Sequence, residues 1–240
     1  MNNIRREEAV IYNQGSEIPL VIERNSRAKR IRLKINRSGR AVLILPVRAS
    51  RRAGLLFAGS KSDWIADQLR RLPQKNVFHD GMSFSFLGRP VVIHHSPAAR
   101  RGVWLAGDVI WVSGQAEHLP RRVLDFLKKE FAAYALKKAR EEAARIQTNV
   151  QKVTVRDTVS RWGSCSKSGH LNFSWRLGLA PLFVTDYVIA HEVSHLVQMN
   201  HSAAFWQIVG ELCPEYRKAE QWLKKNTTYL YSFAGSEKKN

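Results

Sequence analysis

The segment HEVSHLVQMNH, residues 191–201, decides how the rest of this chain is interpreted. It begins inside a stretch, residues 181–198, that we expect to be helical. An α-helix turns by about 100° per residue, so His191 and His195 lie on one face of that helix, one turn apart. Two imidazoles placed in this way can reach one metal ion, and the carboxylate of Glu192 lies beside them.

His201 is the natural third ligand, because catalytic zinc takes three protein ligands and keeps a fourth position open. Five residues separate it from His195, which is enough for the helix to end and the chain to turn back. Asn200 tolerates the left-handed conformation that such a reversal often needs. Ser202 is then expected to cap a further helix over residues 203–212.

These residues predict a zinc-dependent hydrolase rather than a helix with solvated or core histidines. Zinc lowers the pKa of its bound water to about 7 and polarises a carbonyl. Glu192 would accept the water proton and pass it to the leaving amine. Tyr216 and His170 are candidates for a hydrogen-bond donor to the oxyanion, although a structural or surface role suits each of them better.

Short segments rich in Val, Ile and Leu, separated by turn residues, dominate the first half of the chain. The predicted strands cover residues 18–23, 30–35, 40–46, 83–88, 90–95, 102–107 and 109–114. A hairpin turn is expected at residues 36–39. A helix is expected over residues 50–71, because apolar residues recur there at helical spacing until Pro73 ends the pattern.

The second half mixes helices with isolated strands. A charged, Ala-rich segment at residues 120–147 predicts a long helix, and RWGSCSKSGH at 161–170 is typical of a loop. The other expected elements are strands over 153–157 and 171–179 and an amphipathic helix over 214–225. The outline is an α+β fold, with a β-rich region up to about residue 118 and a mixed region after it.

Three segments of the C-terminal third carry a family resemblance, together with the order in which R-W-G-S-C and H-E-x-x-H-x5-H occur. The segments are SRWGSCSKSGHLNFSWRLGLAP at 160–181, DYVIAHEVSHLVQMNHSAAFWQIV at 186–209 and LCPEYRKAEQWLK at 212–224. They resemble the YgjP-like metallopeptidase domain family, which is related to the SprT-like and WLM-type zinc peptidases. The basic segments RAKRIRLKI and RAVLILP nearer the N-terminus fit the same family.

Joined to the pattern of elements, the resemblance implies three regions. They are a β-rich basic region over residues 1–118, a zincin-like metallopeptidase core over 119–228 that holds an H-E-x-x-H active-site helix, and a C-terminal tail over 229–240. Gln198 stands where metzincins carry a glycine, which argues against membership of that group and leaves the turn geometry open.

The same resemblance implies zinc as the cofactor, with His191, His195 and His201 as its ligands. Glu192 would act as the catalytic acid and base. A protein or peptide substrate would lie in extended form along an edge strand beside the active-site helix, and residues 171–177 are the expected strand.

Basic residues outnumber acidic ones, 39 Lys and Arg against 20 Asp and Glu, which gives a net charge of +19. A field of this sign attracts polyanions such as nucleic acid, ribosomes or acidic membranes. Residues 24–52 hold eleven basic residues beside one acid, Glu23, so this basic N-terminal surface is a candidate for phosphate contacts. The solvated face of a strand would produce the same run. The second hypothesis for the whole chain is therefore a non-enzymatic nucleic-acid or ribosome-binding module with a structural zinc site.

Cysteine usage and the lack of long apolar runs bear on the compartment. With Cys165 and Cys213 alone no disulfide framework is expected, and a reducing compartment fits. The N-terminus lacks the apolar run of a signal peptide, and no segment reaches the roughly 18 apolar residues that span a bilayer. The simplest interpretation is a soluble cytoplasmic protein without a membrane partner.

Two further groups of side chains near the metal motif have two interpretations each. Trp162, Trp175 and Trp206 could stack on a substrate, although core packing is the commoner role of tryptophan. Cys165 could supply a fourth ligand and make the zinc structural, but three histidines already complete the ligand set of an open site.

Overall fold

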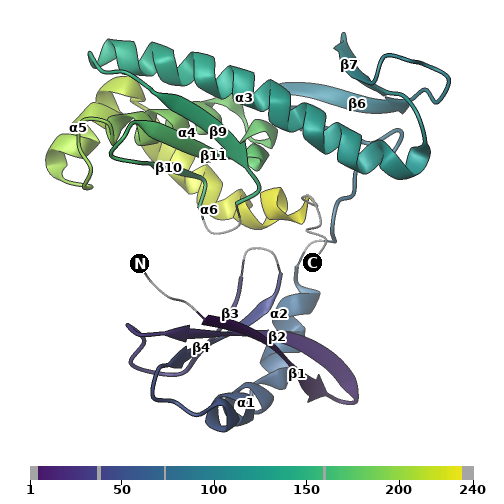
Figure 1. Ribbon diagram of the computed structural model, residues 1–240, viewed down its shortest axis with the longest axis vertical. Helices are drawn as coiled ribbons and strands as arrows, with labels where there is room; N and C mark the ends of the chain where they lie inside the picture. Colours follow the sequence, from purple (N-terminus) through teal and green to yellow (C-terminus); the bar gives the residue numbers. More distant parts are fainter. Residues whose placement is uncertain (1–4, 37–38, 73, 159–160, 234–240) are drawn as a thin grey trace. The chain divides into compact units, whose positions relative to one another are not determined.

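The computed structural model describes residues 5–36, 39–72, 74–158 and 161–233 (Figure 1). The chain divides into two compact units, Met1–Gln74 and Lys75–Asn240, and each unit has a hydrophobic core of its own. Strands and six α-helices occur together in the described residues. This confirms the α+β class and the β-rich N-terminal region.

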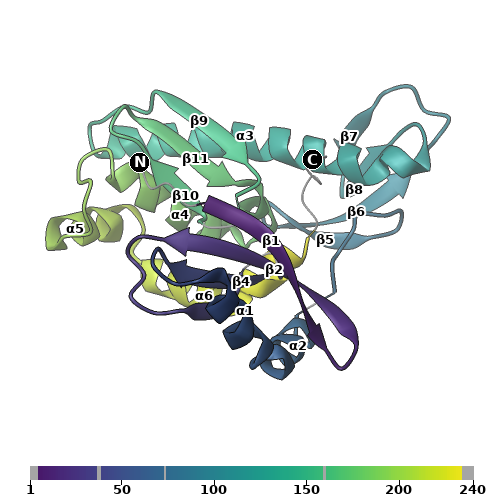
Figure 2. The same cartoon turned by 60° about the horizontal axis from the view of Figure 1, so that its bottom comes forward.

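The N-terminal unit consists of a four-stranded sheet and two short helices that pack against it (Figure 2). Its elements are β1 (Arg5–Asn13), β2 (Ser16–Asn25), β3 (Arg32–Ile35), β4 (Ala41–Pro46), α1 (Arg51–Gly59) and α2 (Ser62–Arg70). The strand order is β1-β2-β4-β3, with β2 and β4 parallel and the other pairs antiparallel. Ile22 and Leu43 of the central strands are fully buried together with Ala58 of α1 and Ile65 of α2. The helices therefore complete the core that the sheet begins.

The strands expected over 18–23, 30–35 and 40–46 are confirmed as β2, β3 and β4. The hairpin turn between the last two is confirmed as well, because the Gly39 amide donates to the Asn36 carbonyl at 3.0 Å. Gly39 has φ +77°, a conformation that glycine adopts without a steric penalty. Residues 37 and 38 of this turn lie outside the described residues.

Two expectations for this unit need correction. The helix expected over 50–71 is broken into α1 and α2, because α1 ends with the Ser60 amide donating to the Leu56 carbonyl at 2.9 Å and a new helix begins at Ser62. Strand β1 is missing from the expected elements, because four of its nine residues, RREEAVIYN, are charged.

The C-terminal unit holds two sheets around the long helix α3 (Leu119–Arg145), which confirms the helix expected over 120–147. The first sheet consists of β5 (Ser83–Phe86), β6 (Arg89–His95), β7 (Val103–Ala106) and β8 (Val109–Val112), in the order β5-β6-β8-β7. Its inward side chains, Phe84 and Ile93 among them, share a core with Phe131 of α3. The four strands expected in this stretch are therefore confirmed.

The second sheet of this unit positions the candidate site (Figure 1). It consists of β9 (Lys152–Arg156), β10 (Gly163–Cys165) and β11 (His170–Ser174), in the order β10-β11-β9. A 3-10 segment, Trp175–Leu179, leads into the helices α4 (Leu182–Ser194), α5 (Ala203–Leu212) and α6 (Tyr216–Ser232). Helix α3 lies against β9 and α4 lies against β10, and Leu171 and Phe173 of β11 are fully buried in the same core.

The elements nearest the site differ from the sequence expectation. The supposed loop at 161–170 contains β10, whose residues Gly, Ser and Cys give little strand signal. The edge strand expected over 171–177 is wrong, because β11 lies in the centre of its sheet and β10 forms the edge. The helix expected over 181–198 already ends at Ser194.

The division between the units falls between Gln74 and Lys75, and not near residue 118 as expected. The first sheet of the C-terminal unit belongs with the second, because Phe86 packs against Gly178 of the 3-10 segment. The Leu87 amide also donates to the Gly178 carbonyl at 2.7 Å.

The expected tail over 229–240 is helical where it begins. Helix α6 continues to Ser232, and Leu230 and Tyr231 are buried. Residues 234–240 lie outside the described residues.

Two polar contacts, one of the buried Arg176 and one of the partly buried Tyr134, tie elements of the C-terminal unit together. Arg176 is only 4% exposed, and its guanidinium pairs with Asp157 and donates to the Phe233 carbonyl at 3.0 Å. Tyr134 of α3 donates its hydroxyl hydrogen to Asp186 of α4. Each contact satisfies a carboxylate that burial would otherwise make costly.

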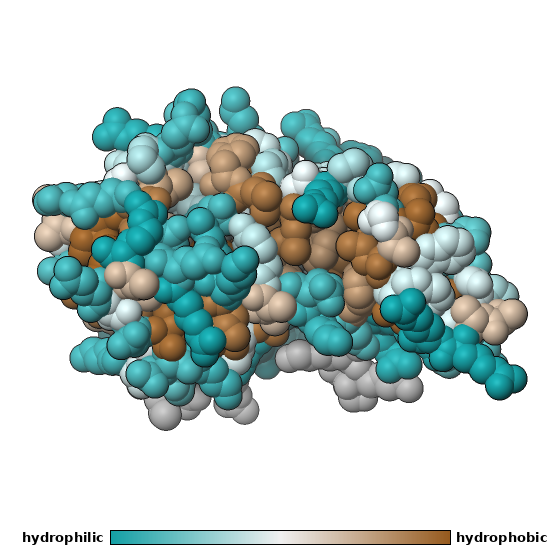
Figure 3. Space-filling view, turned by 90° about the horizontal axis from the view of Figure 1, so that it is seen from above, coloured by the Kyte–Doolittle hydropathy of each residue, from teal (hydrophilic) through white to brown (hydrophobic). Residues whose placement is uncertain are grey.

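Hydrophilic side chains cover most of the face drawn in Figure 3, and apolar side chains show between them in separate areas. Helix α3 follows the same division, because Val123, Leu127 and Phe131 on one side are fully buried while its lysines and arginines lie outside the core. Within the described residues, none of the helices is long and apolar enough to cross a membrane.

Candidate metal centre

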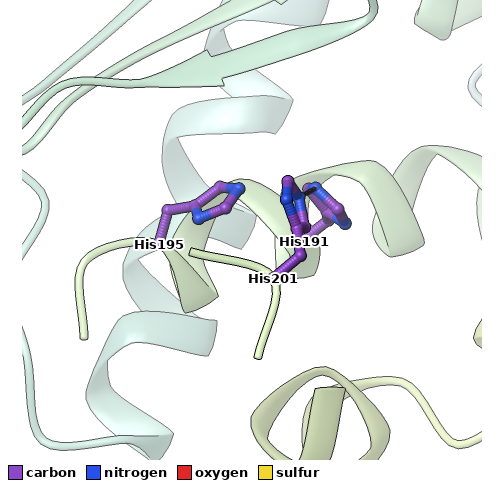
Figure 4. Close-up of side chains that lie close together, drawn as sticks. All are labelled: His191, His195 and His201. Atoms are coloured by element: carbon purple, nitrogen blue, oxygen red, sulfur yellow. Dashed lines mark hydrogen bonds between the residues drawn. The ribbon is translucent and has the colours of Figure 1, made fainter. Parts of the chain in front are cut away.

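Three histidine side chains converge at the C-terminal end of α4 (Figure 4). His191 projects from the last turn of the helix, His195 is the residue that follows it, and His201 lies in the connection to α5. One ring nitrogen of each lies within 4.8 Å of the other two. In the part of the chain that the structure describes, this is the one group of three or more side chains suited to hold a metal ion.

The spacing of these rings suits a tetrahedral zinc ion. Two nitrogens bound to zinc at the tetrahedral angle lie about 3.3 Å apart, and Nε2 of His191 lies 3.2 Å from Nε2 of His201. The other separations extend up to 4.8 Å, so the rings must draw somewhat closer around an ion. Three imidazoles also leave the fourth position of a tetrahedral ion open, as in catalytic zinc sites.

The surroundings of two of the rings favour the neutral form that binds a metal. Burial, and then the charges of His195 and His201, lower the pKa of His191 to about 4. Burial also lowers the pKa of His195, against the opposing effect of its hydrogen bond to the backbone of Gln198. That bond joins Nδ1 of His195 to the Gln198 carbonyl at 2.9 Å. A carbonyl only accepts, so Nδ1 carries the hydrogen and Nε2 keeps its lone pair for a metal.

The segment that joins the last two histidines turns in a way that the sequence did not indicate. Asn200 is not in the left-handed conformation that was expected of it. Its side-chain oxygen instead accepts from the Ser202 amide at 3.2 Å, which holds the turn before α5. Ser202 caps that helix as expected, since its hydroxyl accepts from the Phe205 amide at 3.4 Å.

Phe205 lies against all three imidazole rings. Its ring centroid is 4.9 Å from that of His191, 4.5 Å from that of His195 and 4.8 Å from that of His201. The side chain is fully buried, so it forms a rigid apolar support for the cluster. Phe205 was not predicted as part of the site from the sequence. Its position three residues after the capping Ser202 is the feature that could have indicated it.

Glu192 extends from α4 toward the edge strand β10. It is 7% exposed, and a Cβ atom on Gly163 would lie 2.5 Å from its carboxylate oxygen Oε1. Burial raises the pKa of Glu192 to about 7, against the opposing positive charge of Arg161. Burial and the charge of Glu192 in turn raise the pKa of the Cys165 thiol to about 11. The thiol therefore stays protonated near neutral pH, and Cys165 lies outside the group of side chains that could hold a metal.

The outer edge of β10 lies beside this carboxylate, and among the described residues its outward backbone groups have no strand partner. The Ser174 amide donates to the Trp162 carbonyl at 2.8 Å, and the Ser166 amide donates to the His170 carbonyl at 3.0 Å. Antiparallel strands pair through alternate residues, so the N–H and C=O groups of β11 meet those of every second residue of β10. The backbone groups of Gly163 and of the residue two further along therefore point to the open edge.

The two candidates for the oxyanion donor lie in different surroundings. The ring of Tyr216 stacks on that of Trp206 at 5.3 Å, and Trp206 lies 6.0 Å from His201. The Tyr216 hydroxyl accepts from Nε of Arg217 at 3.3 Å. His170 is exposed at the start of β11 and has no ring contact with the histidine cluster within the described residues. Of the two, Tyr216 is the one beside the cluster.

The three tryptophans divide between the core and the site. Trp175 is fully buried and belongs to the core of the C-terminal unit. Trp162 is partly buried and packs on Tyr231 with ring centroids 4.8 Å apart. Trp206 is partly buried too, but it alone of the three contacts the rings of the histidine cluster. Core packing thus accounts for Trp175. For Trp206, which lies beside the histidine cluster, stacking on a substrate stays a prediction.

A family model agrees with the sequence motifs. The model of the YgjP-like metallopeptidase domain matches residues 29–226. Among solved structures, the chain is similar to the metallopeptidase zymogen abylysin of Pyrococcus abyssi, with 19% identity over 39% of this chain and 93% of that one. The TM-score of 0.34 is too low for this likeness to support a shared fold. No curated protein matches the chain.

Proposed function

Because the chain belongs to the YgjP-like metallopeptidase domain family, we propose that it is a zinc-dependent peptidase that hydrolyses peptide bonds with His191, His195, His201 and Glu192. The proposal is carried by one observation. Three imidazoles from two different segments converge, and Glu192, the residue that follows His191 in α4, carries a buried carboxylate that stays outside the ligand group. A structural zinc site has no need for such a carboxylate.

The roles of the residues follow from their positions. Three histidines would hold zinc and leave one position for water and substrate, and imidazole is a ligand that suits this metal. When bound, the ion supplies a Lewis acid that lowers the pKa of a coordinated water and polarises the scissile carbonyl. Glu192 would take the proton from the attacking water and return it to the amine that leaves. Gln198 holds His195 in the tautomer that ligates.

We propose that a substrate peptide binds in extended form along the outer edge of β10. The backbone groups of Gly163 and Cys165 that point away from β11 would hydrogen-bond to its main chain, as in other cases of strand addition. Gly163 has a second function in this arrangement, because its lack of a side chain lets Glu192 reach the strand edge. The main chain of a substrate held there would then lie beside the Glu192 carboxylate.

Nucleic acid is a further partner that we propose for the N-terminal unit. Arg27, Lys29, Arg30, Arg32 and Arg52 are exposed, and among the described residues none of them has an acidic partner within 4.0 Å. Uncompensated cations at this density attract phosphates and bind them in a salt-dependent way. Peptidase action on proteins attached to nucleic acid would use both units.

The second candidate function, a nucleic-acid or ribosome-binding module with a structural zinc, is favoured by the net charge of +19. The two functions differ in what the histidine cluster does. A structural zinc would stabilise the fold and leave proteins intact, whereas the peptidase needs the open position of the metal.

Digestion of an unfolded protein separates the two. The purified chain, loaded with one equivalent of zinc, is incubated with casein, with casein plus a chelator, and with casein plus chelator and excess zinc. We expect fragments in the first and third samples and intact casein in the second. Intact casein in all three samples, from a protein that holds zinc, would favour the structural role.

A further inference from the structure

Each end of strand β10 opens onto a cavity in the C-terminal unit. The larger cavity, about 440 Å³, lies where β10 ends, and its lining includes Ser166, Lys167, Ser168, His195 and Met199. We name it the Lys167 cavity. It reaches a proposed metal ligand directly, because His195 is part of its wall.

The smaller cavity lies where β10 begins. It measures about 80 Å³ and is lined by Arg156, Thr158, Arg161, Gly163, Ser164 and Asn172. We name it the Arg161 cavity. It is adjacent to Glu192, because Gly163 in its wall lies against that side chain. A peptide extended along β10 would therefore reach one cavity on each side of the bond that is cut.

Both cavities are basic and without acids. Lys167 is the charged side chain in the lining of the first, and Arg156 and Arg161 are those of the second. All three are exposed, and among the described residues none forms an ion pair with a carboxylate. Apart from His195 in the first cavity, the remaining polar side chains of the linings are hydroxyls and amides, which donate hydrogen bonds to anions as readily as to neutral groups.

The sequence around β10 lacks acidic residues over a longer stretch. From residue 158 to residue 185 there is no Asp or Glu. Asp157, just before it, is taken up by the buried Arg176. Glu192 is the acid that approaches β10 from α4, and it is buried. Arg161 acts on the buried Glu192 only through its charge, and among the described residues no ion pair occupies the cations at either end of the strand. They are therefore accessible to a ligand.

We infer that the protein selects extended peptide segments that carry carboxylates on both sides of the cleaved bond. This inference rests on the proposed function, since it assigns the substrate class of the same site. Lys167 would pair with a carboxylate on one side, and Arg161 with Arg156 would pair with one on the other. A peptide fits better than a nucleic acid here, because the edge of β10 offers main-chain donors and acceptors and the cavities beside it take side chains.

A set of matched peptides tests the inference. All share one neutral sequence with a fluorophore and quencher at its ends, and each carries Glu, Gln or Lys at a single position on either side of the bond that is cut. A further pair differs only in a free or amidated C-terminus, because a terminal carboxylate offers the same chemistry as a side chain. Cleavage by the zinc-loaded protein is measured, and binding to the Glu192→Gln variant is measured by fluorescence anisotropy on the same sequences without a quencher.

We expect Glu peptides to exceed their Gln partners roughly threefold to fivefold in kcat/KM, and Lys peptides to fall below both, as for partly exposed ion pairs. The difference should shrink at high salt. In Lys167→Glu the preference at one position should reverse toward Lys. The matched control Lys224→Glu changes the net charge equally on an exposed position of α6 and should keep the parent's preference.

The outcomes separate this inference from the proposed function. If peptides are cleaved without a preference for Glu, or if Lys167→Glu leaves the preference unchanged, the acidic specificity is wrong while the peptidase stands. If no peptide is cleaved, the proposed peptidase function is wrong. A preference for Glu peptides in binding that reverses in Lys167→Glu would in that case still support carboxylate recognition. A single-stranded oligonucleotide that displaces Glu peptides and loses affinity in Lys167→Glu would overturn the assignment to peptides.

Discussion

The carboxylate of Glu192 lies directly against the α-carbon of Gly163, so that a single added methyl group would lie 2.5 Å from its oxygen Oε1. The contact joins the helix of the histidine cluster to the strand that offers an open edge. It brings an acid, a proposed metal site and a peptide-binding edge within reach of one another. The proposed chemistry depends on this contact, and so does the first prediction.

We predict that Gly163→Ala lowers peptide hydrolysis roughly 10-fold to 100-fold, because the new methyl group displaces the carboxylate of Glu192 from its place. Zinc content should stay at the parent's level, since the histidines are untouched. The measurement is kcat/KM together with metal content. Gly210→Ala is the matched control, because a Cβ there meets no atom within 4 Å. Equal activity of the two variants would show that the contact is unimportant.

We predict that Phe205→Leu weakens zinc binding roughly tenfold, because the ring that supports all three imidazoles is replaced by a smaller side chain. The affinity is measured by competition with a chromogenic chelator. Phe131→Leu is the control, since Phe131 is equally buried but lies in α3 and has no ring contact with the histidines. If both variants lose zinc affinity to the same extent, the effect is a general loss of packing.

We predict that Arg176→Met lowers the free energy of unfolding of the C-terminal unit by about 3 to 5 kcal/mol, because Asp157 is left without its buried partner. The Phe233 carbonyl also loses a donor. Chemical denaturation followed by tryptophan fluorescence measures the change. The exposed pair of Lys218 with Glu215 provides the comparison, and Lys218→Ala should cost less than about 1 kcal/mol. A loss below that level for Arg176→Met would contradict a stabilising role.

We predict that Tyr134→Phe lowers the free energy of unfolding by about 1 to 3 kcal/mol, because Asp186 loses a hydrogen-bond donor in a partly buried place. Burial, followed by the hydrogen bond to Asp186 and its charge, raises the pKa of Tyr134. The folded state thus favours the protonated phenol. The stabilisation that this hydrogen bond contributes is fully present below about pH 10, the pKa of tyrosine in the unfolded chain. It is lost as the pH rises through the pKa of Tyr134 in the folded protein.

Denaturation curves of the parent and of Tyr134→Phe over pH 7 to 11 measure this difference. The gap between the two proteins should be constant up to roughly pH 10 and should narrow above it. A gap that widens with rising pH would mean that the folded state favours the phenolate, contrary to the contact with Asp186.

Much of the histidine cluster was predictable from spacing alone. His191 and His195 lie one helical turn apart because the backbone keeps its helical conformation up to His195. Ser202 has the side chain of a helix cap. The length of the helix was harder to predict. It ends at Ser194, before His195, and Asn200 turns the chain through a side-chain hydrogen bond and not through a left-handed backbone.

The parts that escaped prediction are those that depend on distant contacts. Strand β10 has three residues of weak strand propensity and forms because β11 pairs with it. Gly163 and Phe205 matter because of what lies across from them, and sequence periodicity does not report such neighbours. The division at Gln74 escaped for the same reason, since the strands after it join a core that helices much later in the chain complete.

The most direct test of the central claim is a paired measurement on Glu192→Gln, with zinc content by mass spectrometry and peptide hydrolysis on the same sample. Glutamine keeps the shape of the side chain and removes the proton acceptor. We expect about one zinc per chain in the parent and in the variant, with hydrolysis in the variant reduced roughly 100-fold to 10,000-fold. A variant that holds zinc and cleaves peptides as fast as the parent would contradict the role of Glu192 and the mechanism built on it.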